Sequence, residues 1–261
     1  MRKTFTAGEG RLDGRAWALA LGLMLWAAEA MPQDLSTFLS RLPAPGSWAT
    51  YRVETSSPDR VKRERFNLSV TGSETVGGVP YVWLEAGPTN FAGYKDGYLR
   101  ILIKAEPSRE ESLNPFLAAF ALAYQEPGGE PFELSPGALS FMHNQAKGVK
   151  VTQERTDLPP SQAVTIRGEV LDCTCARITT RTLTRFLGRD YLSVETGTYW
   201  FSQRTPFQLV KAEIERVETK DGKERRRTVL VTLKEAGTTG AASKFSGPVR
   251  KEKGLLGLLF H

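Results

Sequence analysis

The sequence predicts a mainly β protein of the α+β class, in which a curved antiparallel sheet or half-barrel is covered by a few short helices. Runs of alternating apolar and polar residues recur along most of the chain, as is typical of half-buried strands. Short turns that contain glycine join several of these runs, which favours antiparallel pairing of neighbouring strands. Two apolar segments in the middle of the chain, each introduced by a proline, predict helices.

Residues 1–30 have the three parts of an export signal. A basic leader that includes Arg2 precedes the apolar run 16–28, and Ala28-Glu29-Ala30 forms a small-x-small cleavage site. The apolar run is too short to span a bilayer. We therefore expect a signal peptide that is cleaved near Ala30 and a periplasmic or secreted mature protein. An uncleaved N-terminal anchor at the membrane interface is the alternative.

The chain is basic, with a formal net charge of +6, and it stays basic when residues 1–30 are removed. On an exported protein this charge favours anionic membrane surfaces or acidic partners over nucleic acid. A soluble surface with a net charge away from zero explains it equally well. The length fits one large β domain, which we expect over residues 31–236.

The first part of this domain predicts one short helix and then a meander of strands. Leu35, Phe38, Leu39 and Leu42 recur at helical spacing within residues 32–42. Alternating patterns then predict strands at 49–54, 65–70, 79–86 and 98–103.

The middle of the chain predicts a helical cover over about residues 114–147. Asn114-Pro115 offers a start for a helix over Phe116–Tyr124, which is apolar nearly all round and must therefore be buried. Ser135-Pro136 repeats the start signal for a second helix over Gly137–Lys147. These helices would lie across the concave face of the sheet, either as part of the core or as a lid over a lipid-sized cavity.

The sheet resumes after the helices. Five further strands are expected, over Ala163–Val170, Cys173–Thr184, Tyr191–Phe201, Phe207–Thr219 and Glu224–Glu235. Asp221-Gly222 is a favoured two-residue turn and predicts a hairpin between the last two. Arg225, Arg226 and Arg227 beside this turn suggest either a phosphate patch or a solvated hairpin end.

Only two cysteines occur, Cys173 and Cys175, and they share one face of an expected strand. A disulfide between them is possible outside the cell, but it requires a bulge or a turn. Buried structural thiols, redox-reactive thiols and a metal site are the other interpretations. The metal site is disfavoured because His143 and His261 do not lie at finger-like or ribbon-like spacing.

Residues 237–261 predict a flexible linker followed by a short apolar tail. Basic residues precede the apolar run 254–260, which is too short to span a bilayer. This end of the chain could contact a membrane surface or dock into the protein's own groove. A terminal strand or helix packed on the core is the alternative.

The order of elements over about residues 32–235 resembles the half-barrel periplasmic carriers and receptors of the lipoprotein localisation factor superfamily. The most motif-like part is Tyr199-Trp200-Phe201-Ser202 with Pro206–Glu213 after it, similar to that family's late strand pair, in which a Trp-bearing strand precedes a proline and a Val-Lys-x-Glu strand. No lipobox cysteine lies near the cleavage site, so the chain resembles a soluble member. The charged stretch 144–160 and the apolar tail depart from the family plan.

The resemblance implies an apolar cavity that buries the acyl chains of a lipid or a lipidated protein. Each buried CH₂ is worth about 0.8 kcal/mol, so such a cavity needs neither a catalytic residue nor a cofactor. The candidate lining residues are apolar or aromatic and come from strands and from the expected helices: Phe66, Trp83, Ile101, Phe116, Phe120, Tyr124, Phe141 and Trp200.

No residue set specifies a reaction. His143 lies in no recognisable catalytic motif, and the chain contains no Gly-x-Ser-x-Gly, no His-Glu-x-x-His and no phosphate loop. We therefore expect an exported envelope protein that binds a lipid or another apolar ligand without catalysis. A structural or protein-interaction module without a ligand, which uses sheet edges and the tail, is the alternative. An enzyme whose site is assembled from distant residues is the third hypothesis.

Overall fold

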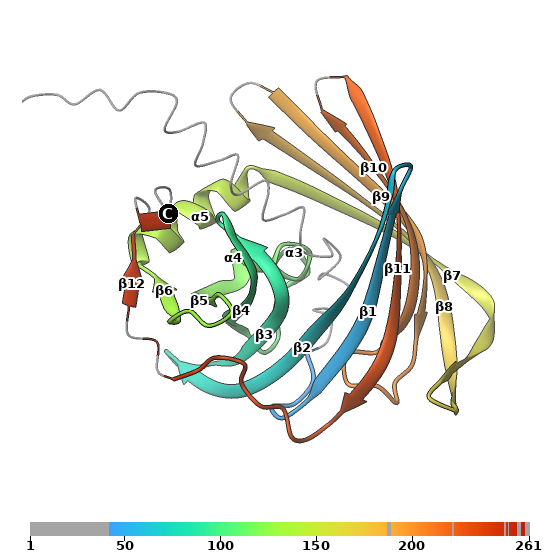
Figure 1. Ribbon diagram of the computed structural model, residues 1–261, viewed down its shortest axis with the longest axis horizontal. Coiled ribbons are helices and arrows are strands. Elements are labelled where there is room, and N and C mark those ends of the chain that lie inside the picture. The colour runs from blue at the N-terminus through green and yellow to red at the C-terminus, as the bar shows by residue number, and fades with distance from the viewer. Residues whose placement is uncertain are drawn as a thin grey trace, which may run out of the picture.

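The computed structural model describes residues 42–186, 189–220, 222–247, 249, 251–254 and 257–258 (Figure 1). The expected signal peptide and nearly all of the expected helix at 32–42 lie outside the described residues. Within the described part, one open sheet of twelve strands curls into a half-barrel with a few short helices. The fold class predicted from the sequence is confirmed.

The strands follow one another along the sheet with few exceptions. In space their order is β12-β6-β5-β4-β3-β2-β1-β11-β10-β9-β8-β7, and every pair is antiparallel except β12 with β6. Their bounds are β1 (Trp48–Ser57), β2 (Arg60–Val76), β3 (Val79–Phe91), β4 (Tyr94–Lys104), β5 (Ala119–Gln125), β6 (Phe132–Leu134), β7 (Val149–Ile166), β8 (Glu169–Phe186), β9 (Arg189–Phe201), β10 (Leu209–Lys220), β11 (Lys223–Gly237) and β12 (Lys251–Lys253).

Three helices interrupt the sheet between β4 and β7. They are α3 (Arg109–Leu113), α4 (Pro115–Ala118) and α5 (Pro136–Lys147). Ser108 begins α3 with a capping box, because its hydroxyl accepts the Glu111 amide and the Glu111 carboxylate accepts the Ser108 amide. Ser135 caps α5 by accepting the Ala138 amide, as the Ser-Pro signal predicts.

The expected helix over Phe116–Tyr124 is wrong. Only Pro115–Ala118 is helical, and Ala119–Gln125 forms strand β5 between β4 and β6. Leu122 and Tyr124 face the core, while Ala123 on the opposite face is buried as well. A strand that is buried on both faces has the same continuous apolar pattern as a buried helix.

The charged stretch 144–160 is also part of the regular structure. It comprises the end of α5 and most of β7, an edge strand that is longer than the sequence predicts. Leu158 pairs with Cys175 and Gln162 with Cys173, so the residues between, which include Pro159-Pro160, bulge out of the ladder.

Beyond this bulge, the β7–β8 hairpin curls back over the outer face of the sheet. We call this part, Gln162–Cys173, the flap. It covers a small second core of Leu171, Cys173, Cys175, Trp200 and Val210. The Trp200 indole donates to Gln162 Oε1 at 2.9 Å. β7 also contacts β11, although three strands separate them in the sheet.

The chain after β11 crosses the outer face at the other end of the sheet. Residues 238–247 and 251–254, here called the strap, run past β3 and β5 to β6. The hydroxyl of Ser243 donates to Glu85 at 2.6 Å, and the Ser246 amide donates to Gln125 at 2.9 Å. β12 then pairs in parallel with β6 (Figure 1).

Candidate functional site

The inner, concave face of the half-barrel is apolar over seven adjacent strands. Alternation along each strand turns every second side chain inward, and the register matches these residues across the sheet, for example Tyr51 with Phe66 and Ile101 with Leu122. The inward residues include Ala49, Tyr51, Phe66, Leu68, Val70, Val82, Leu84, Leu99, Ile101, Ile103, Leu122, Tyr124, Ala212, Ile214, Val229, Val231 and Leu233. They form one continuous apolar surface, and each of these residues is buried, at most 6% exposed.

Two buried tyrosines place hydroxyl groups in this surface, and both hydroxyl groups form hydrogen bonds. Tyr51 donates to the Leu209 carbonyl at 3.1 Å, and Tyr124 donates to the Thr89 carbonyl at 2.8 Å. Tyr124 also accepts the Gly97 amide at 2.9 Å, an approach that leaves no room for a Cβ at Gly97. Burial raises the pKa of both hydroxyls above the usual range, so both stay neutral.

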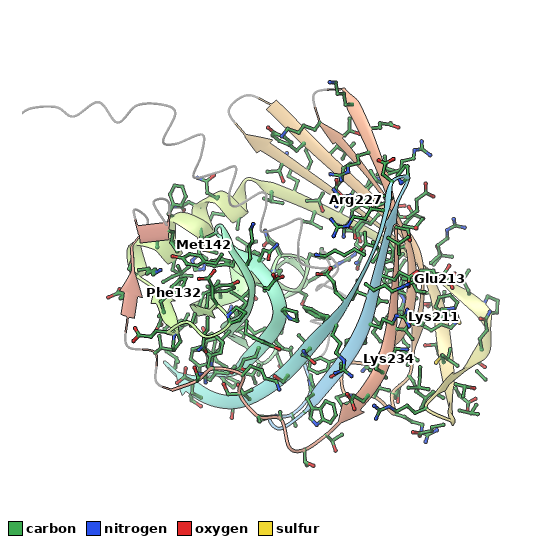
Figure 2. All side chains as sticks on the ribbon, in the orientation of Figure 1. Phe132, Met142, Lys211, Glu213, Arg227 and Lys234 are labelled. Carbon is green, nitrogen blue, oxygen red and sulfur yellow. The ribbon has the colours of Figure 1, made fainter. Side chains whose placement is uncertain are left out.

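One end of the inner face carries the helices and an aromatic cluster. Figure 2 shows Met142 of α5 and Phe132 of β6 at this end. Tyr94 packs against Phe132 with ring centroids 5.0 Å apart and the ring planes tilted by 47°, and Lys253 of the strap lies over both rings. His143 Nε2 lies 2.8 Å from the Ala119 carbonyl, so this histidine joins α5 to β5.

The opposite end of the inner face is charged. Arg216 Nε lies 2.6 Å from the Glu195 carboxylate, and these side chains are only 6% and 4% exposed. Arg227 pairs with Glu218 at 3.3 Å on the same face of β10 and β11. Figure 2 shows Arg227 inside the curve of the sheet, whereas Lys211 and Glu213 lie outside it. The inner face is therefore amphiphilic, apolar at β1–β5 and charged at the far ends of β9–β11.

A separate hollow of about 520 Å³ lies beside the loop that joins β9 to β10. Arg155, Asp172 and Gln208 are among its polar lining residues, and the Arg155 guanidinium lies 5.2 Å from the centre of the Phe201 ring. Its mixed lining contrasts with the apolar inner surface.

Sequence reasoning placed four of the eight candidate residues on or against the inner core. Phe66, Ile101 and Tyr124 belong to this core, and the half-buried Phe116 packs against it. Phe141 is half-buried on α5.

Three candidates lie on the outer face. Trp83 lies beneath the Arg100 guanidinium at 4.6 Å, Trp200 belongs to the second core under the flap, and Phe120 is 50% exposed against Tyr81. Phe120 occupies the register shift between β4 and β5, which explains its outward direction. None of these three can line the concave face.

Other inner residues were missed because they are ordinary strand aliphatics, such as Leu68, Leu84 and Val231. The alternation within the expected strands indicated these residues. Candidates were selected for their aromatic character instead, and at Trp83 and Trp200 this picked side chains that point to the outer face. The charged group of Glu195, Arg216, Glu218 and Arg227 was also missed, because in sequence it is indistinguishable from an exposed charged strand face.

The cysteines and the hairpin arginines have structural partners. Cys173 and Cys175 are free, buried thiols in the second core, and burial, with the neighbouring Cys175 and Asp172, raises the pKa of Cys173. Arg226 pairs with Glu215 at 3.7 Å and with Glu224 at 3.5 Å. No group of three or more metal-ligating side chains occurs among the described residues. None of the helices in the described ranges has the length and apolarity needed to cross a membrane.

Comparison with known proteins gives structural matches only. No protein-family model and no curated protein matches the sequence. The solved structures similar to this chain include a protein from Bacteroides fragilis, assigned as exported and of YmcC-like fold. It has 10% identity and a TM-score of 0.34, and the match covers 75% of this chain and 98% of that one.

Two further matches have names related to the superfamily that the sequence resembles. One is named for lipoprotein sorting and the other for the LolA superfamily. A domain from Vibrio parahaemolyticus, assigned to outer membrane lipoprotein sorting, has 8% identity and a TM-score of 0.31, with 84% of this chain and 95% of that chain covered. A LolA superfamily protein from Nitrosomonas europaea has 13% identity and a TM-score of 0.24, with 83% and 92% covered. At these values the matches do not assign a function.

Proposed function

We propose that this protein is an exported envelope protein that holds a lipid or another apolar ligand against the concave face of its half-barrel, without catalysis. The observation that carries the proposal is the continuous apolar inner surface from β11 and β10 through β1 to β5. A sheet needs only a modest apolar face to pack on a few short helices. Here the apolar face extends beyond the strands that the helices contact, which are β4, β6 and, through α5, β7.

The chemistry of such a site requires burial and no reactive group. Each CH₂ of an acyl chain that leaves water contributes about 0.8 kcal/mol. The charged end of the inner face, with Arg216 and Arg227, lies where the polar end of an amphiphile would be oriented. A diacyl lipid or the lipid moiety of a lipoprotein has this division into an apolar and a polar part.

The test is native mass spectrometry of the full chain purified without detergent from the periplasm of an expressing bacterium. We expect bound lipid, and we expect Val53→Trp to reduce it severalfold. Val53 is half-buried, packs against the inner core and lies near the middle of β1, so an indole there fills the concave face without adding charge.

The matched control is Val61→Trp, because Val61 is 53% exposed on β2. Phe120→Glu is a second control, since Phe120 lies on the outer face, and it should leave lipid content unchanged. A wild-type protein that is free of lipid and takes up no fatty acid on titration contradicts the proposal.

A second candidate function is a protein-interaction module without a ligand. One observation favours it: β7 is a long strand at the sheet edge, on the side away from β8, and edge strands pair readily with a further strand. A lipid-free protein that captures an envelope partner through β7 would support this alternative.

A further inference from the structure

The outer face of the sheet holds a cleft of about 400 Å³ that is separate from the concave face. Its lining comes from β1, β2, β11 and the flap tip: Arg52, Arg63, Glu64, Arg65, Arg167 and Lys234. We call it the basic cleft. The flap makes it concave, because the β7–β8 turn brings Arg167 over strands that are distant from β7 in the sheet.

Repulsion between these cations destabilises the folded sheet unless an opposite charge compensates it. Arg52 and Arg65 are directly opposite each other on neighbouring strands β1 and β2. Like charges at directly opposed positions destabilise a sheet. Arg167 adds a further positive charge from a turn residue with a φ of 51°, a conformation that a non-glycine residue rarely adopts.

The carboxylates around the cleft do not balance the cations. Glu235 is shared by Arg65 at 3.8 Å and Arg167 at 3.0 Å.

Glu54 is likewise shared, by Arg63 at 2.7 Å and Arg52 at 3.4 Å. Glu64, the one acidic lining residue, pairs with Lys62, and within the described part of the chain Lys234 has no carboxylate partner. The arginine side chains are 48–70% exposed, so solvent reaches them around the cleft.

We infer that the basic cleft binds a phosphate-bearing anion. Guanidinium groups offer paired donors that match phosphate oxygens, and several of them around one concavity compensate a multiply charged group. The phosphate belongs either to a free small anion or to a lipid headgroup at a membrane surface. This inference does not rest on the proposed lipid carriage, because the cleft and the concave face lie on opposite faces of the sheet.

The experiment has two arms on the purified full chain at low ionic strength. Inorganic phosphate is titrated by calorimetry, and vesicles of phosphatidylcholine with or without phosphatidylglycerol are tested by co-flotation. The variant is Arg65→Glu with Lys234→Glu. We expect it to weaken binding about tenfold or more, because it reverses two charges inside the cleft.

The control variant is Arg226→Glu with Lys223→Glu, which changes the net charge equally at the exposed β10–β11 tip. Arg167→Glu is a further test variant that lies in a turn and leaves the strands intact. Phosphate binding that only the cleft variants lose supports a site for free anions. Cleft-dependent binding to phosphatidylglycerol vesicles alone supports a headgroup site. Equal loss in the cleft and control variants, or no binding in either arm, overturns the inference.

Discussion

Glu85 shows how a single buried carboxylate holds two distant parts of the chain together. Its side chain is 1% exposed on β3, and it accepts the Ser243 hydroxyl at 2.6 Å and the Lys244 amide at 2.8 Å. Arg100 Nε lies 3.6 Å away and supplies a compensating charge. A buried carboxylate is stable only with such partners.

We therefore expect Glu85→Ala to lower the free energy of unfolding by about 2–3 kcal/mol, because it removes the carboxylate on β3 that pairs with Arg100 and the acceptor for the strap. Urea denaturation measures the loss, and limited proteolysis between residues 238 and 247 should become faster. Glu213→Ala is the control, since Glu213 forms an exposed ion pair with Lys211 and should cost less than about 0.5 kcal/mol. Equal losses in the two variants would refute this role of Glu85.

The two cysteines lead to a second prediction at this scale. Both thiols are free and buried, and the raised pKa of Cys173 keeps its reactive thiolate scarce at neutral pH. The folded protein should therefore react slowly with iodoacetamide, and unfolding in urea without reductant should allow both thiols to be alkylated. Mass spectrometry counts the added groups. A native mass two hydrogens lower, with no alkylation after unfolding, would reveal a Cys173–Cys175 disulfide instead.

The face of the sheet to which each side chain points was the feature of the site that the sequence predicted least well. Strand β3 is apolar at both parities, with Val82 and Leu84 inward and Trp83 outward. An apolar side chain is tolerated at the outward position 83 because the Arg100 guanidinium covers the Trp83 ring. Apolar and polar residues alternate along a strand only when one face of the sheet is in solvent. The alternation is lost where the strap or the flap covers the outer face.

At the scale of elements, β5 is the clearest failure of prediction and the β10–β11 hairpin the clearest success. Alternation and the Asp221-Gly222 turn signal gave the hairpin directly, and its register is regular along both strands. Ala119–Gln125 carries no such alternation, because the inner core lies on one face and strap residues approach the other. Alanine-rich apolar runs also have high helix propensity, so only tertiary contacts decide this segment.

Two carboxylates face each other where β12 pairs with β6, and their repulsion predicts that the stability of this pairing depends on pH. Glu252 lies opposite Glu133 in the parallel register. Burial, with the charges of Glu252 and Glu74, raises the pKa of Glu133, and Arg100 offsets this only in part. A carboxyl whose folded pKa lies above its unfolded value destabilises the folded state at neutral pH, and this penalty is relieved as the pH falls through the folded pKa.

The strap should therefore be held more tightly at pH 5 than at pH 7. Hydrogen exchange of the amides in residues 251–253, corrected for its intrinsic pH dependence, should show greater protection at the lower pH. Glu133→Gln should give the tighter state at both pH values, whereas Glu224→Gln at the remote hairpin tip should leave the difference intact. A pH difference that persists in Glu133→Gln would assign the effect to another group.

At the scale of the whole molecule, the strap and the flap cover parts of the outer face of the sheet. The strap supplies the edge strand β12 beside the short strand β6, and the flap folds a second core onto the outer face at the other end. A terminal strand packed on the core was one of the alternatives that the sequence offered for the tail, and β12 agrees with it. The pairing of β12 with β6 and the position of the flap were not predictable from local patterns, because each depends on contacts between segments far apart in sequence. Trp48 with Thr239 and Glu85 with Ser243 are examples. The residues 237–247, for which the composition predicts a linker, make several of these contacts.

Truncation after Gly237 tests how far the half-barrel depends on the strap. The shortened chain loses the donors to Glu85 and Gln125, the buried Leu258 and the strand that covers the β6 edge. We expect a thermal midpoint lower by roughly 10 °C or more, because several kcal/mol of contacts are lost, and self-association through the exposed edge. Differential scanning calorimetry and size-exclusion chromatography measure the two effects.

Lys244→Ala is the matched control for this truncation, because it removes a side chain of the strap but keeps the backbone amide that Glu85 accepts. It should leave both the thermal midpoint and the elution volume unchanged. If the truncated chain remained as stable as the full chain, the half-barrel would be complete at β6, and the strap would be a removable cover over Glu85 and the β6 edge. If the midpoint falls and the chain associates, the strap is part of the folded unit, and any ligand of the concave face binds to a sheet whose β6 edge is already occupied.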